Sequence, residues 1–515
     1  MKMEINCKLL DCTLRDGGYY TSWDFDTALI DTYTRCMGLL PVDYIEVGYR
    51  NNPSGDYMGK LGYTPLSVLR RIREQYTKKI VTMLNEKSTR PSDLERLLVP
   101  IRKEVDMVRI AVDPANFERA VDLARAVKDL GFEVGFNVMY MSKWKEQSGF
   151  MGKLHLTDGI ADLFCMVDSF GGITPGEVEV ICHEVKANTS CPIGFHGHNN
   201  LQLGLPNTLT AIRCGVDFVD ATILGMGRGA GNLNMELLLT VLNKSGLDVD
   251  FNVLGEAVSA FQPLLDKYKW GTNLPYMLSG AHSIPQKEVM EWVTNRAYSF
   301  NSVVRALDNK RNKREDNARY PIFAGHNAKC VLVVGGGNSV VEHKDAILEY
   351  LGKHPQTAIV FVTTRHVAGF ASVENPKYFI LVGNEAKRMK TNIKAEEFTG
   401  ACILPPYPRK MGTEIPGYAE HSTYELKQIT FTCDYPDSCT TVALQTAIDL
   451  GAEEIALVGY DGYKGGILSE KETDLTNENR TIFHAFGQMM DGKRFYSLTP
   501  SLYRSLKVNS IYQFI

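Results

Sequence analysis

Short apolar segments recur about every 30 residues between residues 8 and 240, and helical patterns fill the intervals. This alternation constrains the fold most, because consecutive parallel strands need a crossover connection, usually a helix. Eight such units over about 230 residues predict a closed (β/α)8 barrel, and their even spacing favours closure over an open doubly wound sheet. The expected strands are Lys8–Cys12, Tyr44–Tyr49, Lys79–Met83, Met107–Val112, Glu133–Tyr140, Leu163–Asp168, Pro192–His198 and Phe218–Thr222.

The chain of 515 residues exceeds what one hydrophobic core usually supports, so we expect further domains. The barrel is expected over residues 1–240, a helical extension over 241–308 and a charged, solvated linker over 309–326. A strand entering a Gly-rich turn then begins a second α/β domain over 327–515, predicted to be Rossmann-like. Its further expected strands are Ala358–Thr363, Tyr378–Val382 and Glu454–Gly459.

The composition, 44% hydrophobic and 23% charged, is typical of a soluble globular protein. A net charge of -4 gives no general attraction to nucleic acid or anionic membrane, and no apolar run reaches the length of a membrane span. The N-terminus lacks the apolar core of a signal peptide, and the eleven cysteines show no disulfide framework. We therefore expect a cytoplasmic protein in which Cys12 and Cys165 pack as buried thiols, whereas assembly into a homo-oligomer stays open.

Polar side chains gather where the expected barrel strands end. The catalytic face of such a barrel is the carboxyl end of its strands, where the loops meet. These side chains are therefore candidates for binding and catalysis, and they are Arg15, Asp16, Glu46, Asn85, Asn137, Tyr140, Asp168, Ser169, His196 and His198.

Three of these segments predict a metal site. His196 and His198 are two residues apart on one strand, so both imidazoles face the same side. Strands one, seven and eight are neighbours in a closed barrel, so Asp16 and Asn232 can approach the same ion. A mixed nitrogen and oxygen set suits a divalent metal and leaves positions for water and a chelating substrate. Two histidines on a strand alone are a weak signal, since they are often ordinary polar residues.

The Gly-rich segment Gly225–Asn232 permits two interpretations. It fits a dinucleotide-binding turn, since it follows a strand and precedes a helix. However, it ends the alternating series, and no βαβ unit with an acidic ribose partner follows it. A tight loop that offers backbone N–H groups to an anion near the metal is the better interpretation.

Together, Thr13-Leu-Arg-Asp-Gly17, Phe195-His-Gly-His-Asn199 and Gly225–Asn232 resemble the motifs of metal-dependent barrel lyases and synthases. That group includes 4-hydroxy-2-oxovalerate aldolase, hydroxymethylglutaryl-CoA lyase and isopropylmalate synthase. The resemblance covers about residues 8–240. It implies Mn²⁺ or Mg²⁺, with Co²⁺ or Zn²⁺ as alternatives, on three residues with a fourth in or near the coordination sphere: Asp16, His196, His198 and Asn232.

The resemblance also implies roles for the remaining residues. Arg15 would stabilise an enolate formed from a 2-oxo acid such as pyruvate, because its charge is fixed, and Ser169 would bind the substrate carboxylate. Glu46, Asn137 and Asn232 are further candidates for substrate binding. The leading hypothesis is an aldolase that joins or separates a 2-oxo acid enolate and an aldehyde.

The general base is where the chain departs from these relatives. The aldolases have a His two residues after the first Gly of the turn, whereas this chain has Gly17-Gly-Tyr19-Tyr20. Either Tyr19 or Tyr20 could accept the proton, or both could shape the pocket while a metal-bound water moves it. The Gly-Glu-Gln of synthases that use acyl-CoA is absent as well. A Claisen-type acyl-CoA synthase or lyase is nevertheless the second hypothesis.

A third hypothesis comes from the C-terminal part. Ser438–Tyr463 and the earlier Gly-rich turn look like the nucleotide-binding fold of bacterial sialyltransferases. That resemblance implies a nucleotide- or nucleotide-sugar-binding, or glycosyltransferase-like, protein and hints at sugar or polysaccharide metabolism. The alternative is a Rossmann-like sheet whose glycines only turn corners. The implied nucleotide-binding residues are Gly335, Asn338, Ser339, Thr440, Gly459 and Asp461.

Overall fold

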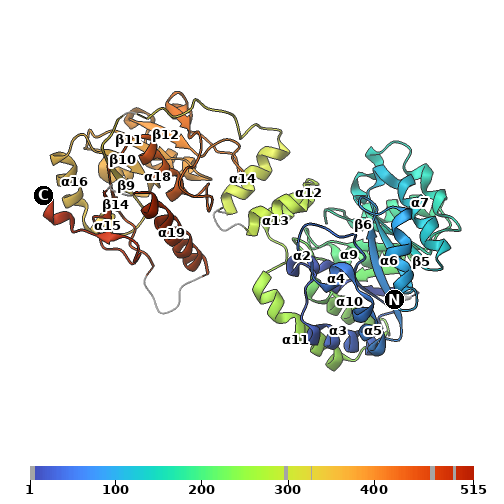
Figure 1. The fold of residues 1–515 in the computed structure, drawn as a ribbon. Helices are drawn as coiled ribbons and strands as arrows, with labels where there is room; N and C mark the ends of the chain where they lie inside the picture. Colours follow the sequence, from blue (N-terminus) through green and yellow to red (C-terminus); the bar gives the residue numbers. More distant parts are fainter. Residues whose placement is uncertain (1–5, 295–297, 299, 326, 464–469, 491–493) are drawn as a thin grey trace. The chain divides into compact units, whose positions relative to one another are not determined.

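The computed structural model describes residues 6–294, 298, 300–325, 327–463, 470–490 and 494–515. The chain divides into two compact units between Glu291 and Trp292, which we call unit 1 and unit 2 (Figure 1). The predicted helical extension over 241–308 is therefore shared between the two units instead of forming one of its own. Within the described ranges, no helix is both long and apolar enough to span a membrane.

Unit 1 is a closed barrel of eight parallel strands in sequential order, as predicted. Strand β1 pairs with β8 in the register Leu9 with Val219 and Asp11 with Ala221, which closes the sheet. Since β7 is the other neighbour of β8, the ends of the first and the last two strands meet at one rim. The strands are β1 (Lys8–Asp11), β2 (Tyr44–Tyr49), β3 (Lys79–Asn85), β4 (Met107–Val112), β5 (Glu133–Val138), β6 (Leu163–Asp168), β7 (Ile193–Gly197) and β8 (Phe218–Ala221).

Helices cover the barrel, and their ends follow local sequence signals. The Asp26 side chain accepts the N–H of Ala28 over 2.8 Å at the start of α3. Thr174 and Glu177 form a capping box around Pro175 at the start of α8. The helices are α3 (Thr27–Leu39), α5 (Leu66–Gln75), α6 (Leu94–Leu98), α7 (Phe117–Asp129), α8 (Pro175–Asn188), α9 (Gly204–Arg213), α10 (Met235–Asn243), α11 (Phe251–Tyr268) and α12 (Leu274–Ala281), with α13 (Gln286–Thr294) at the unit boundary.

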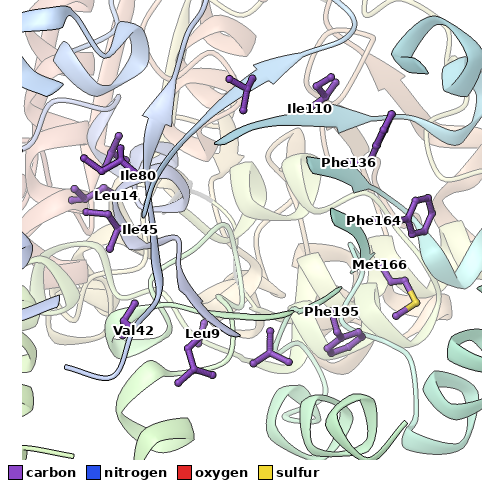
Figure 2. Close-up of a cluster of buried hydrophobic side chains, with 14 of the residues drawn as sticks. Leu9, Leu14, Val42, Ile45, Ile80, Ile110, Phe136, Phe164, Met166 and Phe195 are labelled. Atoms are coloured by element: carbon purple, nitrogen blue, oxygen red, sulfur yellow. The ribbon is translucent and has the colours of Figure 1, made fainter. Parts of the chain in front are cut away.

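Two apolar layers stabilise the barrel, because successive strand residues face opposite sides. Outward side chains such as Ile45, Ile110 and Phe136 pack in the large layer between sheet and helices (Figure 2). Each such side chain contributes about 1.5–3 kcal/mol when fully buried. The second layer fills the barrel interior and consists of Leu10, Cys12, Tyr44, Val81, Met107, Leu163, Cys165, Val167 and Phe218.

Unit 2 is an open α/β domain with an eight-stranded parallel sheet, as the sequence predicted in outline. From β9, the next strands along the chain add on one side of the sheet, and the strands from β14 onward add on the other side of β9. Apolar clusters cover both faces of the sheet. Helices α18 (Cys439–Asp449) and α19 (Glu470–Met489) cover one face, and α16 (Lys344–Lys353) covers the other. In spatial order the strands are β13 (Thr423–Glu425), β12 (Ala401–Leu404), β11 (Lys377–Ile380), β10 (Ala358–Phe361), β9 (Cys330–Val334), β14 (Glu454–Val458), β15 (Arg494–Ser497) and β16 (Lys507–Val508).

The segment expected to be a solvated linker, 309–326, is exposed over residues 310–315 and makes backbone contacts with the sheet domain beyond them. Helix α14 (Phe300–Arg311) extends into it. The carbonyl of Asp316 then accepts the N–H of Thr413 over 2.8 Å, and Phe323 N–H donates to the carbonyl of Glu425 over 2.8 Å. These backbone hydrogen bonds attach the charged run to the edge of the sheet, which its composition alone does not reveal.

Candidate active site

A cavity of about 210 Å³ lies at the carboxyl ends of the barrel strands. Most of the predicted site residues of unit 1 line it, although they come from loops far apart in the sequence. Parallel strands bring their carboxyl ends to one rim, which is why the loops after them converge. The predicted residues that line the cavity are Arg15, Asp16, Tyr19, Asn85, Asn137, Tyr140, Ser169, His196 and His198.

The turn after β1 brings Arg15 and Asp16 into the barrel mouth. Two short helices, α1 (Thr13–Asp16) and α2 (Gly18–Thr21), follow the strand without a linker. A Cβ atom on Gly17 would lie 2.5 Å from the Met226 sulfur, and one on Gly18 would lie 2.1 Å from the Trp23 ring. Only glycines therefore allow this close packing, which leaves both charged side chains buried.

The two histidines are held in one tautomer by their Nδ1 atoms. His196 Nδ1 lies 2.9 Å from Asp220 Oδ2, and His198 Nδ1 lies 2.8 Å from the carbonyl of Asp168. A carbonyl and a carboxylate only accept, so both Nδ1 atoms donate and both Nε2 atoms keep their lone pairs. Burial, with a smaller contribution from His196, lowers the pKa of His198 to about 3. A neutral imidazole with a free Nε2 is the form that binds metals.

Asp16 and Asn232 complete a mixed donor set. Asp16 Oδ2 lies 3.6 Å from His196 Nε2 and accepts a hydrogen bond from Asn232 Nδ2 over 2.8 Å. Burial alone would raise the pKa of Asp16, but the charge of Arg15 and the hydrogen bond from Asn232 hold it below its usual value. Asn232 Oδ1 is buried without a hydrogen-bond partner among the described residues. Two imidazole nitrogens, one carboxylate and one amide oxygen fit a divalent cation.

Cys12 lies beside these donors but does not line the cavity. Its sulfur is 3.6 Å from Asp16 Oδ2 and 3.9 Å from His196 Nδ1. Burial, followed by the negative charge of Asp16, raises the pKa of Cys12 well above its ordinary value. Without a metal, the residue is therefore a thiol, and its sulfur donates to the Asp16 carboxylate and to the carbonyl of Ala221.

A buried charge ring supports the donor set from below. We use this name for Arg15, Asp16, Glu46, Arg109, His196 and Asp220. Arg15 donates to Asp16 and, through Nε, to Glu46 Oε2 over 2.7 Å. Arg109 Nη2 donates to Asp220 Oδ2 over 2.8 Å, while its Nη1 lies 3.7 Å from Glu46 Oε2. The ring closes through His196, because its imidazole lies between Asp220 and Asp16.

Arg109 and Asp220 belong to the site but were not among the residues predicted from the sequence. Both are fully buried on strands that otherwise carry apolar residues, Met107–Val112 and Phe218–Ala221. A charge inside such a strand was the available signal, since buried charges need partners. Burial would raise the pKa of Asp220, but Arg109 and His196 hold it below its usual value.

Known proteins are similar to the half of the chain that forms the barrel. The model of the HMGL-like family matches residues 6–257. A 4-hydroxy-2-oxovalerate aldolase from Carboxydothermus hydrogenoformans is 33% identical over 253 residues, which are 47% of this chain and 72% of that relative. The chain belongs to the HMGL-like family.

Further relatives match the same half of the chain. A 4-hydroxy-2-oxovalerate aldolase from Pelotomaculum thermopropionicum is 29% identical over 272 residues, covering 50% of this chain and 77% of that relative. The solved N-terminal domain of a protein from Bacteroides vulgatus, provisionally described as an aldolase, is 67% identical with a TM-score of 0.56. The match covers 58% of this chain and 99% of that solved domain. These matches concern the HMGL-like barrel.

The two tyrosines of the HMGL-like turn have different surroundings. Tyr19 lines the cavity, and its hydroxyl lies 3.4 Å from that of Tyr49. Tyr20 does not line the cavity: its hydroxyl donates to the carbonyl of Gly229 over 3.3 Å, and its ring packs on Trp270. Burial raises the pKa of Tyr20 well above its ordinary value. Of the two, only Tyr19 can reach a substrate in this cavity.

The other predicted binding residues lie at different depths. Asn137 lines the cavity, and its Oδ1 is buried without a hydrogen-bond partner in the described part of the chain. Ser169 lines it too, and its Oγ accepts the N–H of Tyr140 over 2.9 Å. Glu46 is fully buried beneath the cavity and bonds to Arg15, so it positions that guanidinium.

In unit 2, most residues predicted to bind a nucleotide come together, but a carboxylate occupies the turn. Asp461 Oδ2 accepts the N–H of Ser339 over 2.9 Å, and its Oδ1 accepts the hydroxyl. An incoming phosphate would have to displace this carboxylate from the same donors. Thr440 Oγ1 instead donates to Asn479 over 2.8 Å. A larger cavity of about 500 Å³ lies beside residues 405–408, and none of the six predicted residues lines it.

Proposed function

We propose that unit 1 is a divalent-metal-dependent aldolase that forms or cleaves a carbon–carbon bond between a pyruvate-type 2-oxo acid and an aldehyde. The observation that carries the proposal is the convergence of Asp16, His196 and His198 on a cavity that Arg15 also lines. The aldolases among the HMGL-like relatives support the same reaction class.

The metal would be held by Asp16, His196 and His198, with Asn232 Oδ1 as a possible fourth donor. The oxygen donors of this set favour Mn²⁺ or Mg²⁺. When bound, such a cation acts as a Lewis acid on the keto oxygen of the substrate.

Arg15 supplies a permanent positive charge next to this site. Its guanidinium is held by Glu46 and Asp16, so it faces the cavity without needing to reorganise when charge develops on the substrate. The polar groups of Ser169 and Asn137 are available to the substrate carboxylate. Together these side chains orient the 2-oxo acid and stabilise its enolate.

Tyr19 is our candidate for moving the proton of the reacting hydroxyl. In the addition direction, the Tyr19 hydroxyl donates its proton to the aldehyde oxygen as the enolate carbon bonds to the aldehyde carbon, and cleavage runs the same steps in reverse. Burial raises the pKa of Tyr49 well above its ordinary value, so Tyr49 keeps its proton and can donate to the Tyr19 oxygen 3.4 Å away. The position of Tyr19 in the cavity supports it over Tyr20 as the candidate.

The proposal is tested by exchange of the methyl protons of pyruvate with D₂O, read by mass spectrometry in the presence of metal. We expect deuterium incorporation that Asp16→Ala and His196→Ala abolish. His155→Ala is a matched control, because His155 is exposed and bonds only locally to the carbonyl of Gly152. Metal binding without any exchange would refute the pyruvate aldolase. Thiol release from acetyl-CoA would instead support a Claisen-type enzyme.

A further inference from the structure

Arg228 is a cation in the active-site cavity that has no hydrogen-bonding or ionic side-chain partner among the described residues. It lies in the Gly-rich loop after β8 and lines the same cavity as Arg15 and Tyr19. Its guanidinium carbon is 5.0 Å from the centre of the Tyr19 ring, a cation–π contact. Its Nε is buried and unbonded, and no side-chain hydrogen bond or ion pair joins Arg228 to any described residue.

The other cations of the cavity are already compensated. Arg15 is paired with Asp16 and Glu46. Lys87 is more than half exposed, and its Nζ lies 4.0 Å from Asp113. A partly buried guanidinium without hydrogen bonds is costly, whereas an anionic ligand would satisfy its planar donors. Arg228 is therefore the group in this cavity whose charge a ligand would complement.

Arg228 lies on the side of the cavity where the aldehyde is expected to bind. Under the proposed function, the Tyr19 oxygen lies next to the carbon that carries the reacting hydroxyl, which is the former aldehyde carbon. Arg228 stacks on that same tyrosine. A substituent on the aldehyde carbon therefore extends toward the guanidinium. The cavity of about 210 Å³ is smaller than typical pockets for drug-sized ligands, so the substituent is short.

We propose that the aldehyde substrate carries an anionic group, a carboxylate or a phosphate, and that Arg228 binds it. This inference rests on the proposed aldolase function. In the addition direction, the methyl carbon of pyruvate loses a proton and bonds to the aldehyde carbon, and the aldehyde oxygen gains a proton. The anionic group takes no part in this chemistry, so Arg228 determines specificity and is not a catalytic residue.

The test compares addition of pyruvate to neutral and anionic aldehydes: propanal, succinate semialdehyde and glycolaldehyde phosphate. We expect kcat/KM for at least one anionic aldehyde to exceed that for propanal by about 30-fold. This ratio corresponds to the free energy of one hydrogen bond to a charged group. Arg228→Met should remove this preference, and Arg228→Lys should retain part of it. The two anionic aldehydes distinguish carboxylate from phosphate. Arg125→Met is the control for loss of a cation, since Arg125 is exposed and pairs only with Asp122.

Two outcomes overturn the inference: a wild-type preference for propanal, or an equal loss for all three aldehydes in Arg228→Met. Deuterium exchange into pyruvate separates this failure from failure of the aldolase function. If exchange is absent, calorimetric titration of wild type and Arg228→Met with inorganic phosphate and with succinate tests the anion site directly. If wild type and Arg228→Met bind each anion with the same affinity, the proposed anion site is overturned. If the variant binds at least one of them about 10-fold or more weakly, the site is supported.

Discussion

Asp220 Oδ2 accepts one hydrogen bond from His196 Nδ1 over 2.9 Å and another from Arg109 Nη2 over 2.8 Å. One oxygen atom thus links a candidate metal ligand on β7 to an arginine on β4, on the far side of the barrel. The carboxylate holds the His196 ring with Nε2 facing the cavity, and Arg109 holds the carboxylate. The buried charge ring therefore orients the donor set before any ligand binds.

Asp220→Asn should weaken metal binding about 10- to 100-fold, the usual effect of changing the partner of a metal-binding histidine. The amide keeps the size of the side chain but loses the charge that orders His196 and Arg109. Competition between the protein and a chelator measures the affinity, and circular dichroism checks the fold. Asp122→Asn is the control, because the Asp122 side chain is 69% exposed. Unchanged affinity in folded Asp220→Asn would contradict the orienting role.

Cys12→Ala should retain the metal, whereas Asp16→Ala should lose it. The reason is that the Cys12 sulfur is a buried thiol that donates to Asp16, while Asp16 is the carboxylate of the donor set. Elemental analysis after gel filtration gives the metal content of each variant. A loss of metal in Cys12→Ala equal to that in Asp16→Ala would identify Cys12 as a ligand instead.

Tyr19→Phe should lower kcat for cleavage by about 100- to 10,000-fold, the usual contribution of a general acid–base group. Tyr20→Phe should change kcat by less than about threefold, because its hydroxyl bonds to the Gly229 carbonyl outside the cavity. Steady-state kinetics on a 4-hydroxy-2-oxo acid compares the two matched variants. Similar values of kcat for wild type and Tyr19→Phe would contradict the role of Tyr19 and favour a metal-bound water as the group that moves the proton.

Asp11 should make the stability of unit 1 depend on pH. Burial raises its pKa to about 6, although Tyr33 donates to it over 2.6 Å. The native state therefore binds this proton more tightly than the unfolded chain, so the stability that it contributes at pH 4 is lost as the pH rises toward 7.

Asp11→Asn removes this titration. The free energy of unfolding of the variant, relative to wild type, should rise by about 2 kcal/mol between pH 4 and pH 7. Denaturant titration followed by tryptophan fluorescence measures it, since three of the four tryptophans, Trp23, Trp144 and Trp270, lie in unit 1. The metal is removed beforehand so that its own binding does not contribute. A difference that stays constant with pH would contradict this prediction.

The barrel could be predicted from the sequence because the alternation of strand and helix patterns is repeated eight times. All eight expected strands are present within a few residues of their predicted ends. In unit 2, the expected central strands are also present, but two strands toward each edge were missed, β12 and β13 on one side and β15 and β16 on the other. Segments of three or four residues, such as Ala401–Leu404 and Thr423–Glu425, are too short to show a period.

By itself, the sequence determined that Arg15, Asp16, His196 and His198 meet at one rim, because parallel strands in a closed barrel bring their carboxyl ends together. Only the tertiary structure decided between Tyr19 and Tyr20, since neighbours on a helix point about 100° apart and either could have faced the cavity. The same holds for the pairing of Arg109 with Asp220 and for the unpaired charge of Arg228. Whether a charged side chain has a partner depends on distances across the barrel, and these distances cannot be read from the spacing of residues along the chain.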